Sequence, residues 1–177
     1  MFLDQWGPLA WELFHYITYT YKDELKEYYT LFFNTIYYIL PCPHCALHIK
    51  TNLSEYNNLP DKNINNRPDF IDWLINVHNI VNNQTKNTNI FDRTKADEKY
   101  LTNKEINIDH TRVLSFIKMF IIAKMNERKI NKNFIRNIIA LCHIYPFKID
   151  YSSEELIRYG KKNKITQENA NEWYNNF

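Results

Sequence analysis

The chain has 177 residues, a formal net charge of +2 and 16% aromatic residues, which fits one ordinary domain or a small domain with an extension. The near-zero net charge and the lack of lysine or arginine runs argue against nucleic-acid or membrane-surface binding. Glycine occurs only at Gly7 and Gly160, which excludes a Walker A loop and a dinucleotide fingerprint, because both need several glycines. This scarcity, with six prolines, disfavours a sandwich or barrel and predicts a helical protein.

The predicted helices of the first half of the chain are marked by aromatic and apolar residues at helical spacing. The first predicted helix has Gly7, Trp11 and His15 on one face. The second covers 24–40 and is ended by Pro41. The third starts at Cys42, and the fourth is opened by Pro68.

The second half begins with residues 87–107, which lose this periodicity and are expected to form a linker or long loop. Further helices are predicted beyond it, and their apolar residues cannot all stay in water at roughly 1.5–3 kcal/mol per large side chain. They must pack on each other, on the first four helices or across a dimer. Asp109 is expected to cap a helix over 111–125. Asn131 or Asn133 is expected to cap a helix over 134–145.

The N-terminus and the apolar runs contain no targeting or membrane signal. Residues 1–6 include an aspartate and no basic residue, unlike a signal peptide, and the runs at 113–123 and 134–145 are too short or too charged to span a bilayer. We therefore expect a cytoplasmic protein without a membrane span.

Cys42 and Cys45 form the segment Cys42-Pro43-His44-Cys45. If a helix begins there, Pro43 takes the first position, where its missing N–H costs nothing. Cys42 then lies at the positive end of the helix dipole beside His44, which favours the thiolate. Since one helical turn can close a disulfide between the two, the favoured interpretation is a redox-active dithiol.

Two other interpretations of the cysteine pair stay open. Half of a zinc site would need ligands from His44, His48 or His78, because the one other cysteine, Cys142, lies in an apolar helix and is expected to be a small buried hydrophobe. The second of these interpretations is a pair of buried thiols with a structural role. We expect no bound metal.

The fourth predicted helix carries a polar stripe. His78, Asn82 and Lys86 are spaced i, i+4 and i+8 beside an apolar stripe, and could together hold an extended anionic ligand with a flat ring. The alternative is a solvated polar face. Likewise, Trp11 and His15 could be ordinary core residues.

Three sequence motifs follow one another over about half of the chain. They are Trp6-Gly7-Pro8-x-x-Trp11-x-x-x-His15, then Leu40-Pro41-Cys42-Pro43-His44-Cys45 followed by His48, then Phe70-x-x-Trp73 followed by His78-Asn79-x-Val81-Asn82. With them the chain resembles the Erv/ALR family of FAD-dependent sulfhydryl oxidases, especially its small viral members.

The resemblance implies an all-α fold in which a four-helix bundle over residues 1–90 holds FAD non-covalently, usually in a homodimer. A linker over 91–107 and a helical extension over 108–177 would follow. The flavin of this family is held by side chains between helices, so no glycine-rich turn is required.

The resemblance also implies residue roles. Cys45 would face the flavin and Cys42 would exchange with the substrate. The residues implied to bind the cofactor are Trp6, Gly7, Pro8, Trp11, His15, Cys45, His48, Trp73, His78, Val81, Asn82 and Lys86.

The implied reaction makes disulfides in partner thiols and passes electrons through FAD to oxygen, giving hydrogen peroxide. Because the chain has no second cysteine pair to act as a shuttle, we expect the partner to be a small CxxC or thioredoxin-like dithiol carrier. An oxygen-driven flavin can make disulfides in a reducing cytosol. This fits a large cytoplasmic DNA virus, with the protein in the host cytoplasm or the virion.

Two alternative functions are weighed against this one. A flavin-free thioredoxin-like oxidoreductase can share the Cys-Pro-His-Cys motif, but its fold needs a strand before the cysteines, where 24–40 is predicted to be helical. A helical adaptor with a vestigial dithiol would use the extension as its working part.

Overall fold

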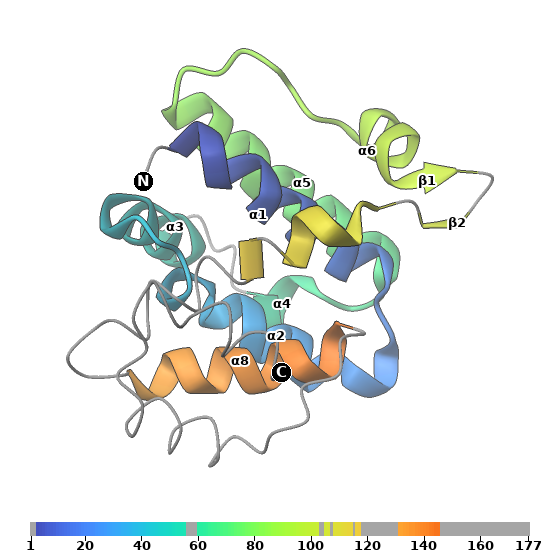
Figure 1. Cartoon of the computed structure of the whole chain (residues 1–177). Helices are drawn as coiled ribbons and strands as arrows, with labels where there is room; N and C mark the ends of the chain where they lie inside the picture. The colour runs from blue at the N-terminus through green and yellow to red at the C-terminus, as the bar shows by residue number, and fades with distance from the viewer. Residues whose placement is uncertain are drawn as a thin grey trace.

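The computed structural model (Figure 1) describes residues 3–55, 60–102, 105–106, 108–114, 116–117 and 131–145 and is built of helices. The longer helices are α1 (Leu3–Tyr19), α2 (Lys26–Asn34), α3 (Pro43–Glu55), α5 (Arg67–Gln84) and α8 (Lys132–Ile144). The short ones are η1 (Asp23–Leu25), η2 (Ile36–Tyr38), α4 (Pro60–Asn63) and α6 (Arg93–Tyr100), and 110–114 and 116–117 are also helical. The described strands, β1 (Leu101–Thr102) and β2 (Glu105–Ile106), form one antiparallel pair. The predicted all-α fold is confirmed.

The core of the bundle is aromatic. Helices α1 and α5 lie side by side, and α3 contacts both α5 and η2 (Figure 1). Phe33 packs edge-on against Phe70 at 5.2 Å and against Trp73 at 5.1 Å between ring centroids, and Phe14 lies 6.0 Å from Phe33. Edge-to-face rings fill space densely and add to the burial of their area. None of the described helices is long and apolar enough to cross a membrane.

The helix starts agree with the local signals in the sequence. Helix α3 begins at Pro43, as predicted. Helix α5 begins one residue before Pro68, because the Asn66 side chain accepts a hydrogen bond from the Asp69 N–H at 2.9 Å.

The single helix predicted over 24–40 is wrong, since η1, α2 and η2 occupy this stretch. The break falls at Thr35, whose φ of −114° is not helical and whose hydroxyl and N–H share the Leu31 carbonyl, at 2.6 and 3.1 Å. The element before the cysteines is the 3-10 helix η2 and not the strand that a thioredoxin-like fold needs, so that alternative is wrong as well.

The linker expected over 91–107 contains α6 and the β1–β2 hairpin. Asp92 caps α6 by accepting from the Lys95 N–H at 2.9 Å, and Ala96 and Tyr100 are buried. The other α6 residues are polar or charged, which is why no periodicity marks this helix in the sequence.

The described part of the extension packs on the bundle and shares its core. Helix α8 lies against α2, and Phe116 stacks on Trp6 with ring centroids 6.3 Å apart. Asp109 and Asn131 cap their helices as predicted. Residues 118–125 of the predicted helix 111–125 and everything after 145 lie outside the described residues, and the division of the chain at 90 and 107 stays a prediction.

Asn137 joins α8 to α2 in a fully buried position. Its Nδ2 donates to the Phe32 carbonyl at 2.7 Å and to the Thr35 Oγ1 at 3.0 Å. These two bonds from Nδ2 favour one register of the two helices, because a slide would leave Nδ2 unpaired as well as Oδ1, which has no partner among the described residues.

His15 and His78 join α1 to α5. The His15 Nε2 lies 3.1 Å from the His78 Nδ1, and Trp11 stacks on His78 with ring centroids 3.8 Å apart. Burial, followed by the charge of Lys99, lowers the pKa of His78 to about 4. Burial, with His78 and then Lys99 as further causes, holds the pKa of His15 well below its usual value. Both imidazoles are therefore neutral near pH 7.

Replacing Asn137 should destabilise the protein. Asn137→Ala is expected to lower the free energy of unfolding by about 2 kcal/mol, because it removes two buried hydrogen bonds. Arg136→Ala, at an exposed position of the same helix, is the control and should change it by less than about 0.5 kcal/mol. Urea unfolding measures both, and equal midpoints for the two variants would contradict the assignment.

Acid should destabilise the fold through the histidine pair. The unfolded chain binds a proton at His78 near pH 6.5, whereas the folded protein resists protonation until about pH 4. Stability is therefore full above pH 6.5 and falls as the pH drops toward 4. At about 1.4 kcal/mol per pKa unit, the loss through His78 is on the order of 3 kcal/mol. His78→Asn should flatten the profile of thermal midpoint against pH in this window; an unchanged slope would sink this explanation.

Candidate functional site

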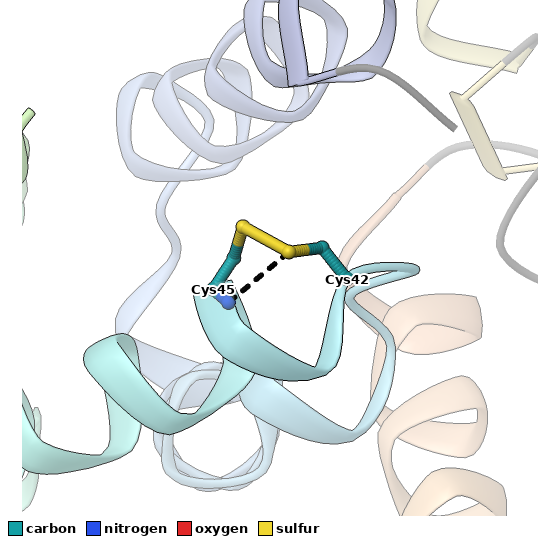
Figure 2. Close-up of a disulfide and its surroundings, with 2 residues drawn as sticks. All are labelled: Cys42 and Cys45. Carbon is teal, nitrogen blue, oxygen red and sulfur yellow. Dashed lines mark hydrogen bonds between the residues drawn. A yellow bond between two sulfur atoms is a disulfide. The ribbon is translucent and has the colours of Figure 1, made fainter.

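The cysteine pair occupies the first turn of α3 as a Cys42–Cys45 disulfide with its Cα atoms 5.3 Å apart (Figure 2). The Cys42 carbonyl accepts the first helical hydrogen bond, from the Ala46 N–H at 2.9 Å. The Cys45 N–H donates to the Cys42 Sγ at 3.2 Å. A sulfur at a helix N-terminus with an N–H aimed at it is stabilised as a thiolate. The predicted dithiol is present and closed.

A pocket lies between α1, α3 and α5, and Cys45 is in its wall. It brings residues of all three sequence motifs together. The lining residues are Trp6, Gly7, Ala10, Trp11, Phe14, Leu40, Cys45, His48, Ile49, Val81 and Thr85. Cys42 is not among them. One turn of helix therefore separates a cysteine in the pocket wall from a cysteine outside it.

The pocket has the features that a flat, polar-edged ring requires. Its walls are mainly aromatic and aliphatic. Two buried polar atoms at or beside it, the Trp6 Nε1 and the His15 Nδ1, find no hydrogen-bond partner among the described residues. Buried polar atoms without partners are uncommon and indicate a ligand or water. The donor set and the apolar walls fit the isoalloxazine or adenine ring of FAD.

Trp11 connects the histidine pair to the pocket. It lines the pocket and stacks on His78, whereas neither His15 nor His78 is among the lining residues. Two aromatic residues that the sequence analysis missed cover the pair from the other side: Tyr100 stacks on His15 at 5.0 Å, and Phe91 lies 5.0 Å from His15. Asn79 holds Phe91 in place through paired hydrogen bonds of 2.6 and 2.9 Å with its backbone.

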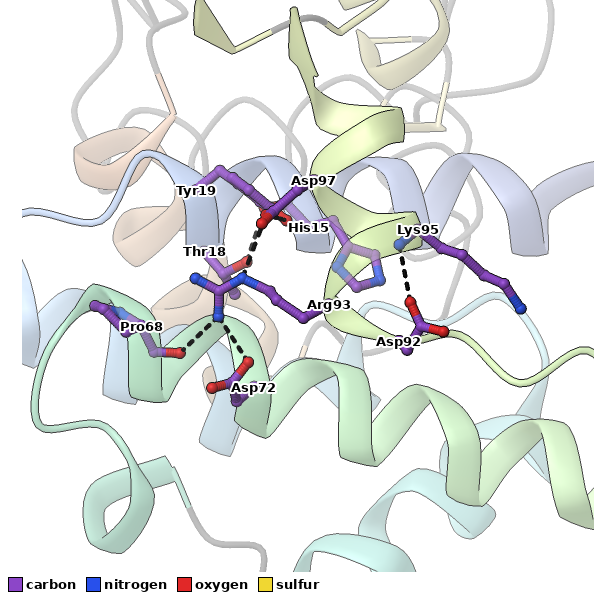
Figure 3. Close-up of polar contacts among 9 residues, drawn as sticks. All are labelled: His15, Thr18, Tyr19, Pro68, Asp72, Asp92, Arg93, Lys95 and Asp97. Atoms are coloured by element: carbon purple, nitrogen blue, oxygen red, sulfur yellow. Dashed lines mark hydrogen bonds and ion pairs between the residues drawn. The ribbon is translucent and has the colours of Figure 1, made fainter. Parts of the chain in front are cut away.

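Polar contacts fasten α6, which carries Tyr100, to the bundle (Figure 3). Arg93 reaches Asp72 of α5 at 2.6 Å and Asp97 of its own helix at 3.2 Å, and the Tyr19 hydroxyl donates to Asp97 at 2.5 Å. Burial and the bond to Asp97 raise the pKa of Tyr19, so it stays protonated. Asp92, four residues before Ala96 and eight before Tyr100, is the one sequence signal that could have revealed this helix.

Other predicted site residues lie away from the pocket lining. Pro8 is exposed on α1, and Trp73 is buried against Phe33 in the core. Asn82 is buried, and its Nδ2 donates to the Asn89 carbonyl at 3.0 Å, which folds the following loop back onto α5.

The single stripe predicted for His78, Asn82 and Lys86 is wrong at Lys86. Helix α5 ends at Gln84, and Lys86 has a φ of 57°, in the left-handed region. Its exposed side chain therefore does not continue the helical stripe that the i+8 spacing assumes.

The metal interpretation finds no support in the described residues, which hold no group of three histidine, cysteine or acidic side chains able to bind an ion. The rings of His44 and His48 lie 4.1 Å apart on α3, but both neighbouring sulfurs are in the disulfide.

Cys142 lies apart from the pair, on α8. It is half-buried, its Sγ donates to the Ile138 carbonyl at 2.9 Å, and burial raises its pKa to about 11. It is thus a protonated thiol near neutral pH and a poor nucleophile.

One family model and one curated viral protein are similar to this chain. Residues 8–101 match the model of the Erv1 / Alr family, so the match continues past the last sequence motif and includes α6. A protein of Acanthamoeba polyphaga mimivirus, named "Probable FAD-linked sulfhydryl oxidase R368", is 34% identical over 109 residues, which cover 58% of this chain and 75% of that protein. No solved structure matches the chain.

The family match covers more than half of the chain and contains the cysteine pair and all the residues that line the pocket except Trp6 and Gly7. The pair, the pocket and the two similarities agree, and the chain belongs to the Erv1/Alr family of FAD-dependent sulfhydryl oxidases.

Proposed function

We propose that this enzyme oxidises pairs of thiols in a partner protein, with Cys42 as the outer cysteine that meets the partner and Cys45 as the inner one. The observation that carries the assignment is that Cys45 lines the pocket whereas Cys42 does not. It agrees with the roles that the family resemblance implies.

The exchange begins with attack of a partner thiolate on the Cys42 Sγ. A bond forms between the partner sulfur and Cys42, the Cys42–Cys45 bond breaks, and Cys45 leaves as a thiolate. The partner's second thiolate then attacks the partner sulfur of this mixed disulfide and releases Cys42. The partner loses two electrons and its two thiol protons, and the cysteine pair of this chain gains the two electrons.

The local structure favours the second exchange, in which Cys42 is released. The Cys45 N–H aimed at the Cys42 Sγ and the helix N-terminus both stabilise negative charge on Cys42, which makes Cys42 a good leaving group in the second exchange. Cys45, in the pocket wall, is positioned to pass electrons to a ring bound there.

FAD, when bound, accepts two electrons from the reduced pair and transfers them to oxygen, giving hydrogen peroxide. We propose that Trp6, Trp11 and Val81 flank the flavin and that His48 lies at its edge beside Cys45. The neutral His15–His78 pair, covered by Phe91 and Tyr100, would form a second aromatic wall for the cofactor.

The remaining predicted cofactor residues have different positions. Gly7 lies in the pocket wall and leaves room there for a ligand. Asn82 and Trp73 would act by holding neighbouring segments in place, and direct contacts from Pro8 and Lys86 stay predictions.

The partner and the assembly complete the proposal. The partner is a dithiol protein, and a small CxxC or thioredoxin-like carrier would suit a chain whose third cysteine is protonated and on another helix. A homodimer, and a site of action in the reducing host cytoplasm or the virion, are further parts of it.

Trp11 should be required for FAD retention. Trp11→Ala is expected to weaken FAD binding by roughly tenfold or more, because a stacked aromatic contact contributes about 0.5–1.5 kcal/mol beyond its buried area. The measurement is bound flavin per chain after gel filtration with added FAD. Tyr28→Ala, at a half-buried ring on α2 away from the pocket, should keep the wild-type flavin content; if both variants stay fully yellow, the pocket is not the cofactor site.

The two cysteines should behave differently when separated. Cys42→Ser and Cys45→Ser should both abolish oxygen consumption with dithiothreitol, whereas Cys142→Ser should keep it. With oxidised glutathione, the Cys45→Ser protein should form a mixed disulfide roughly tenfold faster than Cys42→Ser, because the remaining Cys42 is outside the pocket and stabilised as a thiolate. Mass spectrometry follows both reactions, and the reverse order of rates would exchange the two roles.

A further inference from the structure

Leu47 is an exposed large apolar side chain next to the redox disulfide. It is 59% exposed, and among the described residues the other exposed large hydrophobic is Ile90, in the loop after α5. Leu47 shares the outward side of α3 with the exposed Pro43 and His44, which precede it by four and three positions. An exposed leucine alone is common, but this one lies two residues after Cys45.

Lys50 continues the same side of α3. Its Nζ lies 5.7 Å from the centre of the Tyr37 ring of η2, and the Tyr37 and Tyr38 rings are 4.5 Å apart. The outward residues of α3 therefore border two tyrosines. We call the surface of Pro43, His44, Leu47 and Lys50 the α3 face.

Among the described residues, the segments that form and border the α3 face carry cations and no carboxylate. The sequence from Tyr28 to Ser54, which includes η2 and nearly all of α3, has no aspartate or glutamate. Helix α8, which contacts η2, has none either and exposes Lys132 and Arg136. The 20 acidic residues of the chain all lie outside these segments, so the described α3, η2 and α8 surface is positively charged although the whole chain carries only +2.

We propose that the α3 face docks an acidic dithiol protein, whose own apolar residue beside its cysteine covers Leu47 and whose carboxylates meet Lys50 and the cations of α8. The inference rests on the proposed function and deepens it by naming the chemistry of the partner. Leu47 supplies an apolar contact that excludes water next to the disulfide exchange site. The surrounding cations steer an acidic partner toward it.

The docking geometry matches the exchange reaction. The partner sulfur must reach the Cys42 Sγ at the start of α3, and the pocket side of the helix is occupied by the walls that Cys45 shares with α1 and α5. The approach is therefore along the outward side of α3. A small thiol such as dithiothreitol needs none of these contacts, which separates docking from chemistry.

The test compares three reduced substrates by oxygen consumption: dithiothreitol, a CxxC peptide with glutamate flanks and a leucine before the first cysteine, and the same peptide with lysine flanks. At low ionic strength the acidic peptide should have a kcat/KM roughly tenfold above that of the basic peptide, and added salt should reduce this ratio. Equal values for the two peptides, while dithiothreitol is oxidised, would overturn the inference.

Matched variants locate the effect. Lys50→Glu should reduce the preference for the acidic peptide, whereas Lys22→Glu, the same charge change at an exposed lysine before η1, should retain it. Leu47→Ser should lower kcat/KM for both peptides and leave dithiothreitol oxidation unchanged, whereas Ile90→Ser should alter neither. If either pair of variants behaves alike, the α3 face is not the docking surface.

Dithiothreitol oxidation by the wild-type, FAD-loaded protein distinguishes a failure of the proposed function from a failure of the docking proposal. If it is absent, the proposed function fails and the inference fails with it. If it is present and the peptides are not distinguished, only the α3 face is rejected.

Discussion

Two prolines determine where α3 begins, and the chemistry of the protein depends on that start. Pro41 cannot continue the preceding 3-10 turn with a backbone donor, and Pro43 is pre-organised for the first helical position. Cys42 and Cys45 are consequently one turn apart. The same start places Cys45 in the pocket wall and leaves Cys42 outside it. A shift of one residue would rotate the pair by about 100° around the helix axis and would move Cys45 out of the wall.

The rest of the bundle holds that wall in place. The stack of Trp11 on His78 and the hydrogen bond between His78 and His15 join α1 and α5, so the two helices that face Cys45 are connected next to the pocket, through its lining residue Trp11. Because both imidazoles are neutral, the contact carries no net charge into the interior. A cofactor that binds between helices in this way needs ring-shaped space and a few polar edges, which explains a redox enzyme with only two glycines.

The second half of the chain completes the core and one end of the site. Helix α8 shields α2 through Asn137, and Phe116 extends the aromatic core at Trp6, which itself lines the pocket. Helix α6 adds Tyr100 to the histidine pair and is fastened by Arg93 and Asp97. Packing in the extension is therefore coupled to the walls of the site, since the same side chains serve both.

The sequence by itself determined what depends on neighbouring residues and on the order of motifs. The start of α3 at Pro43, the cap at Asn131 and the closure of Cys42 with Cys45 are local, because each involves atoms a few residues apart. Tertiary structure decided the rest. Thr35 breaks an apolar pattern that continues across the break, and Lys86 leaves its stripe because α5 ends before it. Helix α6 is stabilised by Tyr100 and Asp97 reaching partners about eighty residues earlier in the chain, contacts that no local periodicity records. Which predicted residues line the pocket and which support it was likewise decided by packing between helices that are distant in the sequence.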